Sequence, residues 1–192
     1  MICLLVPEMK MGKLIMVNIE KCLACKSCEI ACAVAHSKSK ILEESIKEHP
    51  TPQRRVTVEA VGELAVPLQC RHCEDAPCIL ICPTAAIHRN QADGPVLIEQ
   101  DKCIGCKFCL MVCPFGVIDV STDGKVIIKC DLCIERTRAG HEPACVEACP
   151  TGALELANEK DLAAQKRQLA AQELVSSTQK NKSKEKQKEN NQ

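Results

Sequence analysis

The sequence predicts an α+β protein whose short repeated units wrap around bound metal. The first observation is composition, because the 192 residues include 17 cysteines but only two Phe and no Trp or Tyr. Side chains alone would fill a core of this size poorly. The second observation is that sixteen cysteines fall into four groups of four, and the third is that the segments flanking these groups repeat. Cysteine at this frequency indicates a disulfide framework or bound metal.

Each repeated unit is expected to run as strand, cysteine loop, short helix, Cys-Pro turn and strand. The segments GKLIMVNIEKC, GPVLIEQDKC and DGKVIIKC each carry a glycine turn signal and an apolar run before a cysteine. Three groups end in CPTAAI, CPFGVI and CPTGAL, where proline disfavours helical geometry at the preceding cysteine. The first group differs, because AVAHS follows Cys32.

The four groups differ in spacing, and the last one is interrupted by eleven residues. They are Cys22-x2-Cys25-x2-Cys28-x3-Cys32, Cys70-x2-Cys73-x4-Cys78-x3-Cys82, Cys103-x2-Cys106-x2-Cys109-x3-Cys113 and Cys130-x2-Cys133-x11-Cys145-x3-Cys149. Only Cys3 is left over, and a free thiol is the favoured interpretation of it.

The remaining segments connect or extend these groups. Between the first two groups, SKSKILEESIKEH predicts a helix that ends before Pro50, and RRVTVEAVGELAVPLQ predicts a hairpin with a turn near Gly62. Residues 158–175 have helix-forming composition, and the polar tail from Ser176 predicts disorder. The expected division is 14–32 with 114–157 as one module, 33–69 as an insert, 70–113 as a second module, and 158–192 as a helix and tail.

Disulfides are the weaker interpretation of the cysteines. No N-terminal stretch resembles a signal peptide, and no stretch approaches 18 apolar residues. We therefore expect a reducing cytoplasm, where thiols stay free for metals, and no membrane span. The formal net charge of zero points to no particular class of partner.

The spacing favours iron–sulfur clusters over zinc. Zinc sites typically use two well-separated CxxC pairs around one tetrahedron. The third group instead has the C-x2-C-x2-C-x3-C-P run of bacterial ferredoxins, in which the fourth cysteine binds a neighbouring cluster. Residues i and i+4 share a helical face, so Cys109 and Cys113 can reach two adjacent clusters. Sixteen ligands then make four [4Fe–4S] clusters.

Because the fourth cysteine of each group binds the cluster of another group, the four groups must exchange ligands in pairs. Three pairings are possible. The simplest nested solution pairs the second group with the third and the first with the fourth. The four ligand sets are then Cys70, Cys73, Cys78 and Cys113; Cys103, Cys106, Cys109 and Cys82; Cys22, Cys25, Cys28 and Cys149; and Cys130, Cys133, Cys145 and Cys32.

From about residue 14 to 157, these motifs resemble the four-cluster ferredoxin-like subunits of molybdopterin oxidoreductases, formate dehydrogenases, hydrogenases and CO dehydrogenases. The resemblance implies the nested pairing and two pseudo-symmetric bacterial-ferredoxin-like modules. Because Cys106 is present, it implies four cubanes. The stretch AHSKSKILEESIKEHPTPQRRVTVEA, with QCRHCEDAPC, looks most similar to the subunit that accompanies CO dehydrogenase.

The implied function is electron transfer, not catalysis. The resemblance implies a relay from CO dehydrogenase to a hydrogenase or an NAD(P)H oxidoreductase. The alternatives are a subunit of a formate dehydrogenase or hydrogenase complex, and a cluster-stapled structural or nucleic-acid-binding module. The residues suggest no nucleic-acid partner, because the lysine-rich tail lacks aromatics. Backbone amides near Ala24, Gly105 and Lys107 are expected to contact the cluster sulfurs.

Several other residues near the cysteines have more than one interpretation. His72, within CRHC, is expected to support the ligands or lie at the surface, not to replace a cysteine. Lys26, Lys107 and Lys129 are expected to be solvated charges that also offset cluster charge. The charged insert 134–144 is interpreted equally well as a connector or as a docking loop, and the helix at 158–175 is a candidate partner contact.

Overall fold

The computed structural model describes residues 13–92, 94–158, 162–164, 166–172 and 174–175, and its short helices and strands make an α+β fold. The chain divides into a unit at 1–156 and a second unit at 157–192. The elements are β1 (Lys13–Val17), η1 (Ile19–Lys21), α1 (Ser27–Ala35), α2 (Leu42–Ser45), β2 (Val56–Val61), β3 (Leu64–Gln69), α3 (Pro77–Leu80), β4 (Ile87–Arg89), β5 (Val96–Ile98), η2 (Gln100–Lys102), α4 (Phe108–Val112), β6 (Ile118–Val120), β7 (Ile127–Lys129), α5 (Ile134–Arg138), α6 (Ala144–Glu147) and β8 (Leu154–Asn158).

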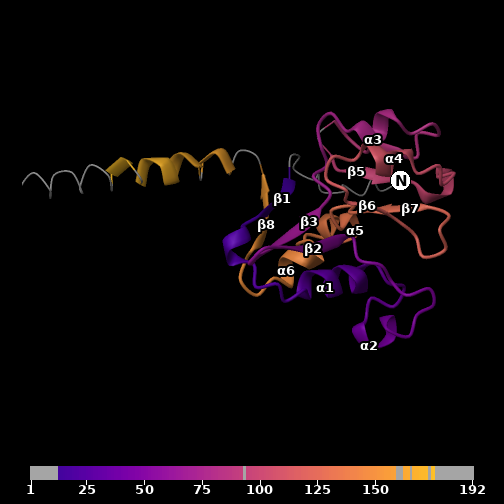
Figure 1. Cartoon of the computed structure of the whole chain (residues 1–192), viewed down its shortest axis with the longest axis horizontal. Helices are drawn as coiled ribbons and strands as arrows, with labels where there is room; N and C mark the ends of the chain where they lie inside the picture. The colour runs from indigo at the N-terminus through magenta and orange to yellow at the C-terminus, as the bar shows by residue number, and fades with distance from the viewer. Residues whose placement is uncertain (1–12, 93, 159–161, 165, 173, 176–192) are drawn as a thin grey trace, which may run out of the picture. The chain divides into compact units, whose positions relative to one another are not determined.

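The strands form four two-stranded sheets: β1 with β8, β2 with β3, β4 with β5, and β6 with β7 (Figure 1). The last three pairs are antiparallel hairpins. The pair β1–β8 joins the start of the core to its end, and next to it the Asn18 N–H donates to the Ala153 carbonyl at 2.8 Å. The chain therefore closes on its own beginning just after the fourth cysteine group.

The predicted hairpin of the insert is present, but its helix is much shorter than predicted. Strands β2 and β3 pair from Val56↔Gln69 to Val61↔Leu64, which leaves a two-residue turn with Gly62 at φ +60°. Only Leu42–Ser45 is α-helical. The backbone N–H groups of Lys38 and Ser39 donate to the Glu48 carboxylate, so the segment folds as a closed loop around that side chain.

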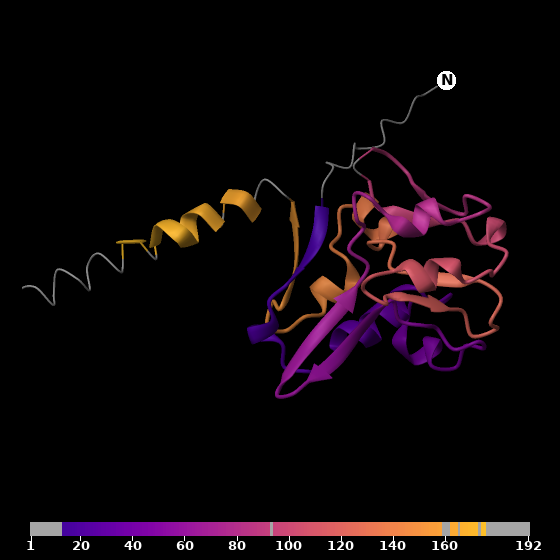
Figure 2. The same ribbon diagram turned by 45° about the horizontal axis from the view of Figure 1, so that its top comes forward.

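The buried apolar residues form two clusters, and each contains cysteines. The first consists of Ile15, Cys28, Cys32, Val56, Val58, Ala65, Leu132, Cys145, Val146 and Leu154. The second consists of Ala76, Cys78, Ile87, Val96, Cys109, Ile118 and Ile127. In Figures 1 and 2 the elements of the first cluster, including α1, α6 and the β2–β3 hairpin, lie apart from α3, α4 and β5.

This packing differs from the expected division at one point. The expected division put residues 114–157 with the first group, but Ile118 and Ile127 pack with the second and third groups because β7 lies against β5. The insert hairpin belongs to the first cluster through Val56, Val58 and Ala65.

The second unit and the tail are described only in part. Residues 162–164, 166–172 and 174–175 are helical, in agreement with the helix predicted at 158–175. The predicted disordered tail from Ser176 lies outside the described residues. Among the residues that the structure describes, no helix is both long and apolar enough to cross a membrane.

Candidate iron–sulfur centres

The structure gathers the sixteen described cysteines into four sets, all as free thiols. Three sets each line a separate small cavity. We name these set I (Cys22, Cys25, Cys28 and Cys149), set III (Cys70, Cys73, Cys78 and Cys113) and set IV (Cys82, Cys103, Cys106 and Cys109). Each has the membership of the nested pairing, with three cysteines from one group and one from its partner group.

Set II contains Cys32, Cys130, Cys133 and Cys145, and it is the most buried of the four. Burial raises the pKa of Cys145, and the neighbouring thiolates of Cys130, Cys32 and Cys133 raise it further. Cys32 and Cys145 also belong to the same buried cluster. Cys28 has a smaller effect on Cys145, but it lines the cavity of set I, so we assign the remaining four cysteines to set II. The eleven-residue insert lengthens the path to Cys145 without removing it from its set.

Left-handed backbone residues shape the ligand loops of sets I and IV. Ala24 and Lys26 have φ of +55° and +58°, and Gly105 and Lys107 have φ of +68° and +64°. Such turns direct successive backbone N–H groups toward one concave side, which suits an anionic cluster. Ala24, Gly105 and Lys107 therefore turn the ligand loops.

Backbone N–H groups contact the sulfurs of several ligands directly. The donors are His72 to Cys70 at 3.4 Å, Leu132 to Cys130 at 3.4 Å, Ala153 to Cys149 at 3.2 Å and Arg55 to Cys32 at 3.2 Å. Hydrogen bonds to the sulfurs are one of the ways in which a protein tunes cluster potential. These donors were not among the residues expected from the sequence.

A left-handed residue follows three of the cysteines that end a group. Ala85, Gly116 and Gly152 have φ between +51° and +62° and come three residues after Cys82, Cys113 and Cys149. Burial raises the pKa of Cys82, but hydrogen bonds from the N–H groups of this turn and with the Thr84 hydroxyl together outweigh it and hold the pKa below its usual value. The same balance lowers the pKa of Cys149.

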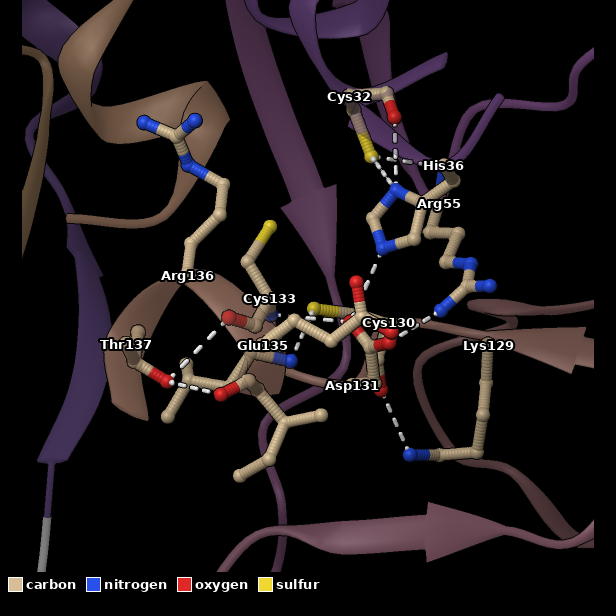
Figure 3. A network of polar contacts seen from close by, with 12 residues as sticks. Cys32, His36, Arg55, Lys129, Cys130, Asp131, Cys133, Glu135, Arg136 and Thr137 are labelled. Atoms are coloured by element: carbon tan, nitrogen blue, oxygen red, sulfur yellow. Dashed lines mark hydrogen bonds and ion pairs between the residues drawn. The ribbon is translucent and has the colours of Figure 1, made fainter. Parts of the chain in front are cut away.

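Cys32 has no such turn, because α1 continues past it to Ala35. A polar network surrounds it instead (Figure 3). The Asp131 carboxylate accepts from His36 Nε2 at 3.1 Å and from Arg55 Nη1 at 2.5 Å, and also from the Cys133 N–H at 2.9 Å. His36 Nδ1 lies 2.7 Å from the Cys32 carbonyl oxygen. The network thus joins the first group, the insert and the fourth group.

Both ring nitrogens of His36 face acceptors, which requires the doubly protonated, cationic imidazole. Burial is the largest single effect and opposes that charge, but the hydrogen bonds to Asp131 and Cys32 together outweigh it and raise the pKa of His36 to about 9. The pKa of Asp131 is held well below its usual range despite burial, because His36 and Arg55 stabilise the carboxylate. His36, Asp131 and Cys133 could in principle hold a metal ion, but these contacts and the membership of Cys133 in set II account for the grouping.

The donor set fits [4Fe–4S] clusters on two structural grounds. Burial raises the pKa of Cys28, Cys109 and Cys133 to about 11, so thiolates there need a nearby cation, which iron supplies. His72 Nδ1 accepts from the Val96 N–H at 3.0 Å, so its proton is on Nε2. That buried Nε2 has no protein partner in the described chain. Cluster sulfur is an acceptor chemically suited to it.

The other residues singled out from the sequence have mixed outcomes. Lys26 and Lys107 are exposed as expected, but Lys129 is 1% exposed, so the expectation that it is solvated is wrong. Two charges of the 134–144 insert, Glu135 and Arg136, are engaged within the chain, through Lys40–Glu135 at 2.6 Å and an Arg136–Glu147 ion pair. Cys3 lies outside the described residues.

Comparisons with known proteins agree with the cysteine pattern. Residues 61–159 match the family described as 4Fe-4S dicluster domain, and residues 19–35 match the 4Fe-4S binding domain. An "Iron-sulfur protein" of Rhodospirillum rubrum is 47% identical over 78% of this chain and 84% of its own length. The "Putative electron transport protein YsaA" of Escherichia coli is 42% identical over 76% of this chain and 89% of its own length.

A third relative belongs to a named enzyme. The iron-sulfur subunit of the nitrate-inducible formate dehydrogenase of Escherichia coli is 30% identical over 77% of this chain and 54% of its own length. None of the three names mentions CO dehydrogenase. The free, clustered cysteines, the matched domains and these relatives together identify the chain as a member of the 4Fe-4S dicluster family, an electron-transfer iron–sulfur protein that binds [4Fe–4S] clusters.

Proposed function

We propose that this protein carries four [4Fe–4S] clusters, one in each of sets I to IV, and serves as the electron-transfer subunit of a formate dehydrogenase or hydrogenase complex. When bound, each cluster accepts and releases one electron. The chain's own part is to hold the clusters in a fixed order, to donate hydrogen bonds to their ligands and to keep water from the inner sets. The observation that carries the proposal is the grouping of sixteen free cysteines into four sets of four.

The sets also lie in the order I–II–III–IV. A linear row of clusters, which we call the wire, is suited to stepwise electron transfer. The Cys28 thiolate of set I raises the pKa of Cys145 in set II, after the larger effects of burial and of set II itself. The Cys78 thiolate of set III likewise raises the pKa of Cys109 in set IV, after burial and other thiolates of set IV. Between sets II and III lies Lys129, whose charge acts on Cys130 and on Cys78.

Exposure supports electron entry and exit at the two outer sets. Cys25 of set I and Cys106 of set IV are exposed, whereas every ligand of sets II and III is buried or half-buried. Large apolar side chains beside the exposed ligands also face solvent, including Leu23 at 69% and Ile104 at 67%. Apolar surface around a ligand loop is suited to contact with a partner protein.

The partner enzyme is inferred from the relatives. The formate dehydrogenase subunit supports a complex of that kind, so a formate dehydrogenase is better supported than CO dehydrogenase. CO dehydrogenase is the second candidate, because the stretch from Ala35 to Ala60 with the QCRHCEDAPC segment resembles the subunit that accompanies it.

Anaerobic co-purification followed by reduction tests this proposal. The purified complex is exposed in turn to formate, hydrogen and CO while the reduced clusters are followed by electron paramagnetic resonance (EPR). We expect signals from several interacting cubanes after formate or hydrogen. Reduction by CO alone would transfer the assignment to CO dehydrogenase. Metal that stays redox-silent in a chain that binds DNA or RNA would contradict the electron-transfer function.

A further inference from the structure

Lys129 is an unusual lysine because it is buried without a carboxylate. It ends β7, immediately before the ligand Cys130, and it is the largest of the fully buried side chains of the described residues. The lysines at comparable places beside ligands, Lys26 and Lys107, are exposed. Burial of an ammonium group is strongly unfavourable unless negative charge or good acceptors lie close by.

The protein satisfies the Lys129 ammonium only with neutral acceptors. Its Nζ donates to the Val96 carbonyl at 2.5 Å and to the Cys130 carbonyl at 2.7 Å. None of the ion pairs found in the described ranges includes Lys129. Asp131 is near in sequence, but its carboxylate faces His36 and Arg55 (Figure 3). The compensating charge must therefore come from another group.

Lys129 lies between two cysteine sets. The carbonyl of Val96 belongs to β5, in the apolar cluster that contains Cys78 of set III, whereas the carbonyl of Cys130 belongs to set II itself. Burial raises the pKa of both Cys130 and Cys78, and the Lys129 charge counteracts that rise at both. One cation therefore acts on ligands of two different sets.

A cation in this position matters for electron transfer. Four thiolates outweigh the positive charge of a cubane core, so the complete centre is anionic and becomes more so on reduction. A fixed positive charge nearby favours the reduced form and raises the reduction potential. A charge shared by two neighbouring centres therefore favours the reduced form of both.

We propose that Lys129 is the shared counter-charge of the two inner clusters, at sets II and III, and that it sets the ease of electron transfer between the two halves of the wire. This inference rests on the four-cluster arrangement proposed above. Lys129 is a tuning residue that acts through space, and it is not itself a ligand.

The test replaces the charge while keeping the volume. Lys129→Met retains an unbranched side chain of similar length, and Lys129→Gln retains a donor for one of the two carbonyls. The matched control is Lys21→Met, which removes an exposed lysine immediately before Cys22 of set I, the same place in the chain that Lys129 has before Cys130. Iron per chain and circular dichroism establish that each variant is folded and loaded, and an anaerobic redox titration followed by EPR gives the midpoint of each cluster.

We expect both Lys129 variants to bind as much iron as the parent protein. At a fixed potential, the ratio of reduced to oxidised cluster should fall at least about tenfold for two of the clusters, a shift of 59 mV for a one-electron couple. The other two clusters, and all clusters of Lys21→Met, should change by less than about threefold, since exposed charges are screened by water.

Three results would overturn the inference. The first is a loaded variant with unchanged midpoints, and the second is a shift that affects one cluster only or appears equally in Lys21→Met. The third is loss of clusters from both Lys129 variants, which would make the lysine a folding element. Failure of the proposed function is distinguishable, because the parent protein would then have no set of four reducible cubanes before any variant is compared.

Discussion

The ligand loops Cys22–Cys28 and Cys103–Cys109 are built alike but tolerate different residues. In both, the second residue after the first cysteine and the residue after the second cysteine are left-handed. A Cβ at Gly105 would lie 2.1 Å from the Lys125 carbonyl oxygen, whereas Ala24 carries a Cβ at the equivalent place. Ligand spacing therefore sets the turn of the loop, and the chain packed against it decides which residue the turn can hold.

The elements that pack around sets III and IV are local in sequence, whereas those around sets I and II are brought together from distant parts of the chain. Short hairpins, β4–β5 and β6–β7, pack around the compact second and third groups. Around the interrupted fourth group, hydrogen bonds between residues far apart in sequence hold the ligands in place. They join Asp131 to His36 and Arg55. An interrupted ligand motif needs such contacts, because its own loop no longer fixes the ligands.

The largest effect should come from removing one ligand in each region. Cys145→Ala should lose one cluster, about four irons per chain, and should also lower the thermal stability of the first apolar cluster, in which Cys145 is buried. Cys106→Ala, at an exposed ligand, should lose a similar amount of iron with a smaller loss of stability. Iron analysis and thermal unfolding measure the two quantities. If Cys145→Ala bound as much iron as the parent protein, Cys145 would not be a cluster ligand.

The comparison of the two loops gives the second prediction. Gly105→Ala should destabilise the protein by roughly 3 kcal/mol, because it combines a left-handed φ with a backbone clash. Ala24→Gly, the matched change in the other loop, should alter stability by less than about 1 kcal/mol. Both values come from thermal unfolding of the loaded protein, and equal effects of the two changes would mean that the contact with Lys125 is unimportant.

Cysteine spacing and flanking turns were sufficient to predict the α+β class and the insert hairpin. Spacing left three pairings of the cysteine groups open, and the nested pairing came from the resemblance to the four-cluster subunits. The linings of three cavities agree with that pairing, and the assignment of the sixteen cysteines as cluster ligands stays a prediction. Spacing and turns could not predict the partners of Asp131, since His36 and Arg55 are 95 and 76 residues away in sequence. The buried Lys129 was missed for a related reason. A lysine next to a cysteine is normally solvated, and only the packing of β7 against β5 encloses this one. The helix predicted in the insert was too long because Glu48 closes the segment into a loop.

The Asp131 network provides the third prediction. Asp131→Asn keeps the size of the side chain but leaves the Arg55 and His36 cations without their carboxylate, which should cost about 2–3 kcal/mol of stability. Asp119→Asn is the control in the other region, because Asp119 is exposed and accepts only from the adjacent Val120 N–H in the described hydrogen bonds. Chemical unfolding of loaded protein should separate the two variants clearly, and matching curves would show that the network does not hold Cys32 and the fourth group together.

The smallest effect should come from the ion pair that ties the insert to α6. Arg136 and Glu147 are 35% and 61% exposed, and exposed pairs stabilise proteins by at most about 1 kcal/mol. Glu147→Gln should therefore leave thermal unfolding nearly unchanged, and Glu135→Gln, which breaks the exposed pair with Lys40, should behave likewise. Binding to the partner enzyme discriminates between the two interpretations of the insert. If it is a connector, neither change alters the affinity measured by pull-down. If it is a docking loop, the affinity changes while the stability does not, because a charge that contributes little within the chain is available to a partner.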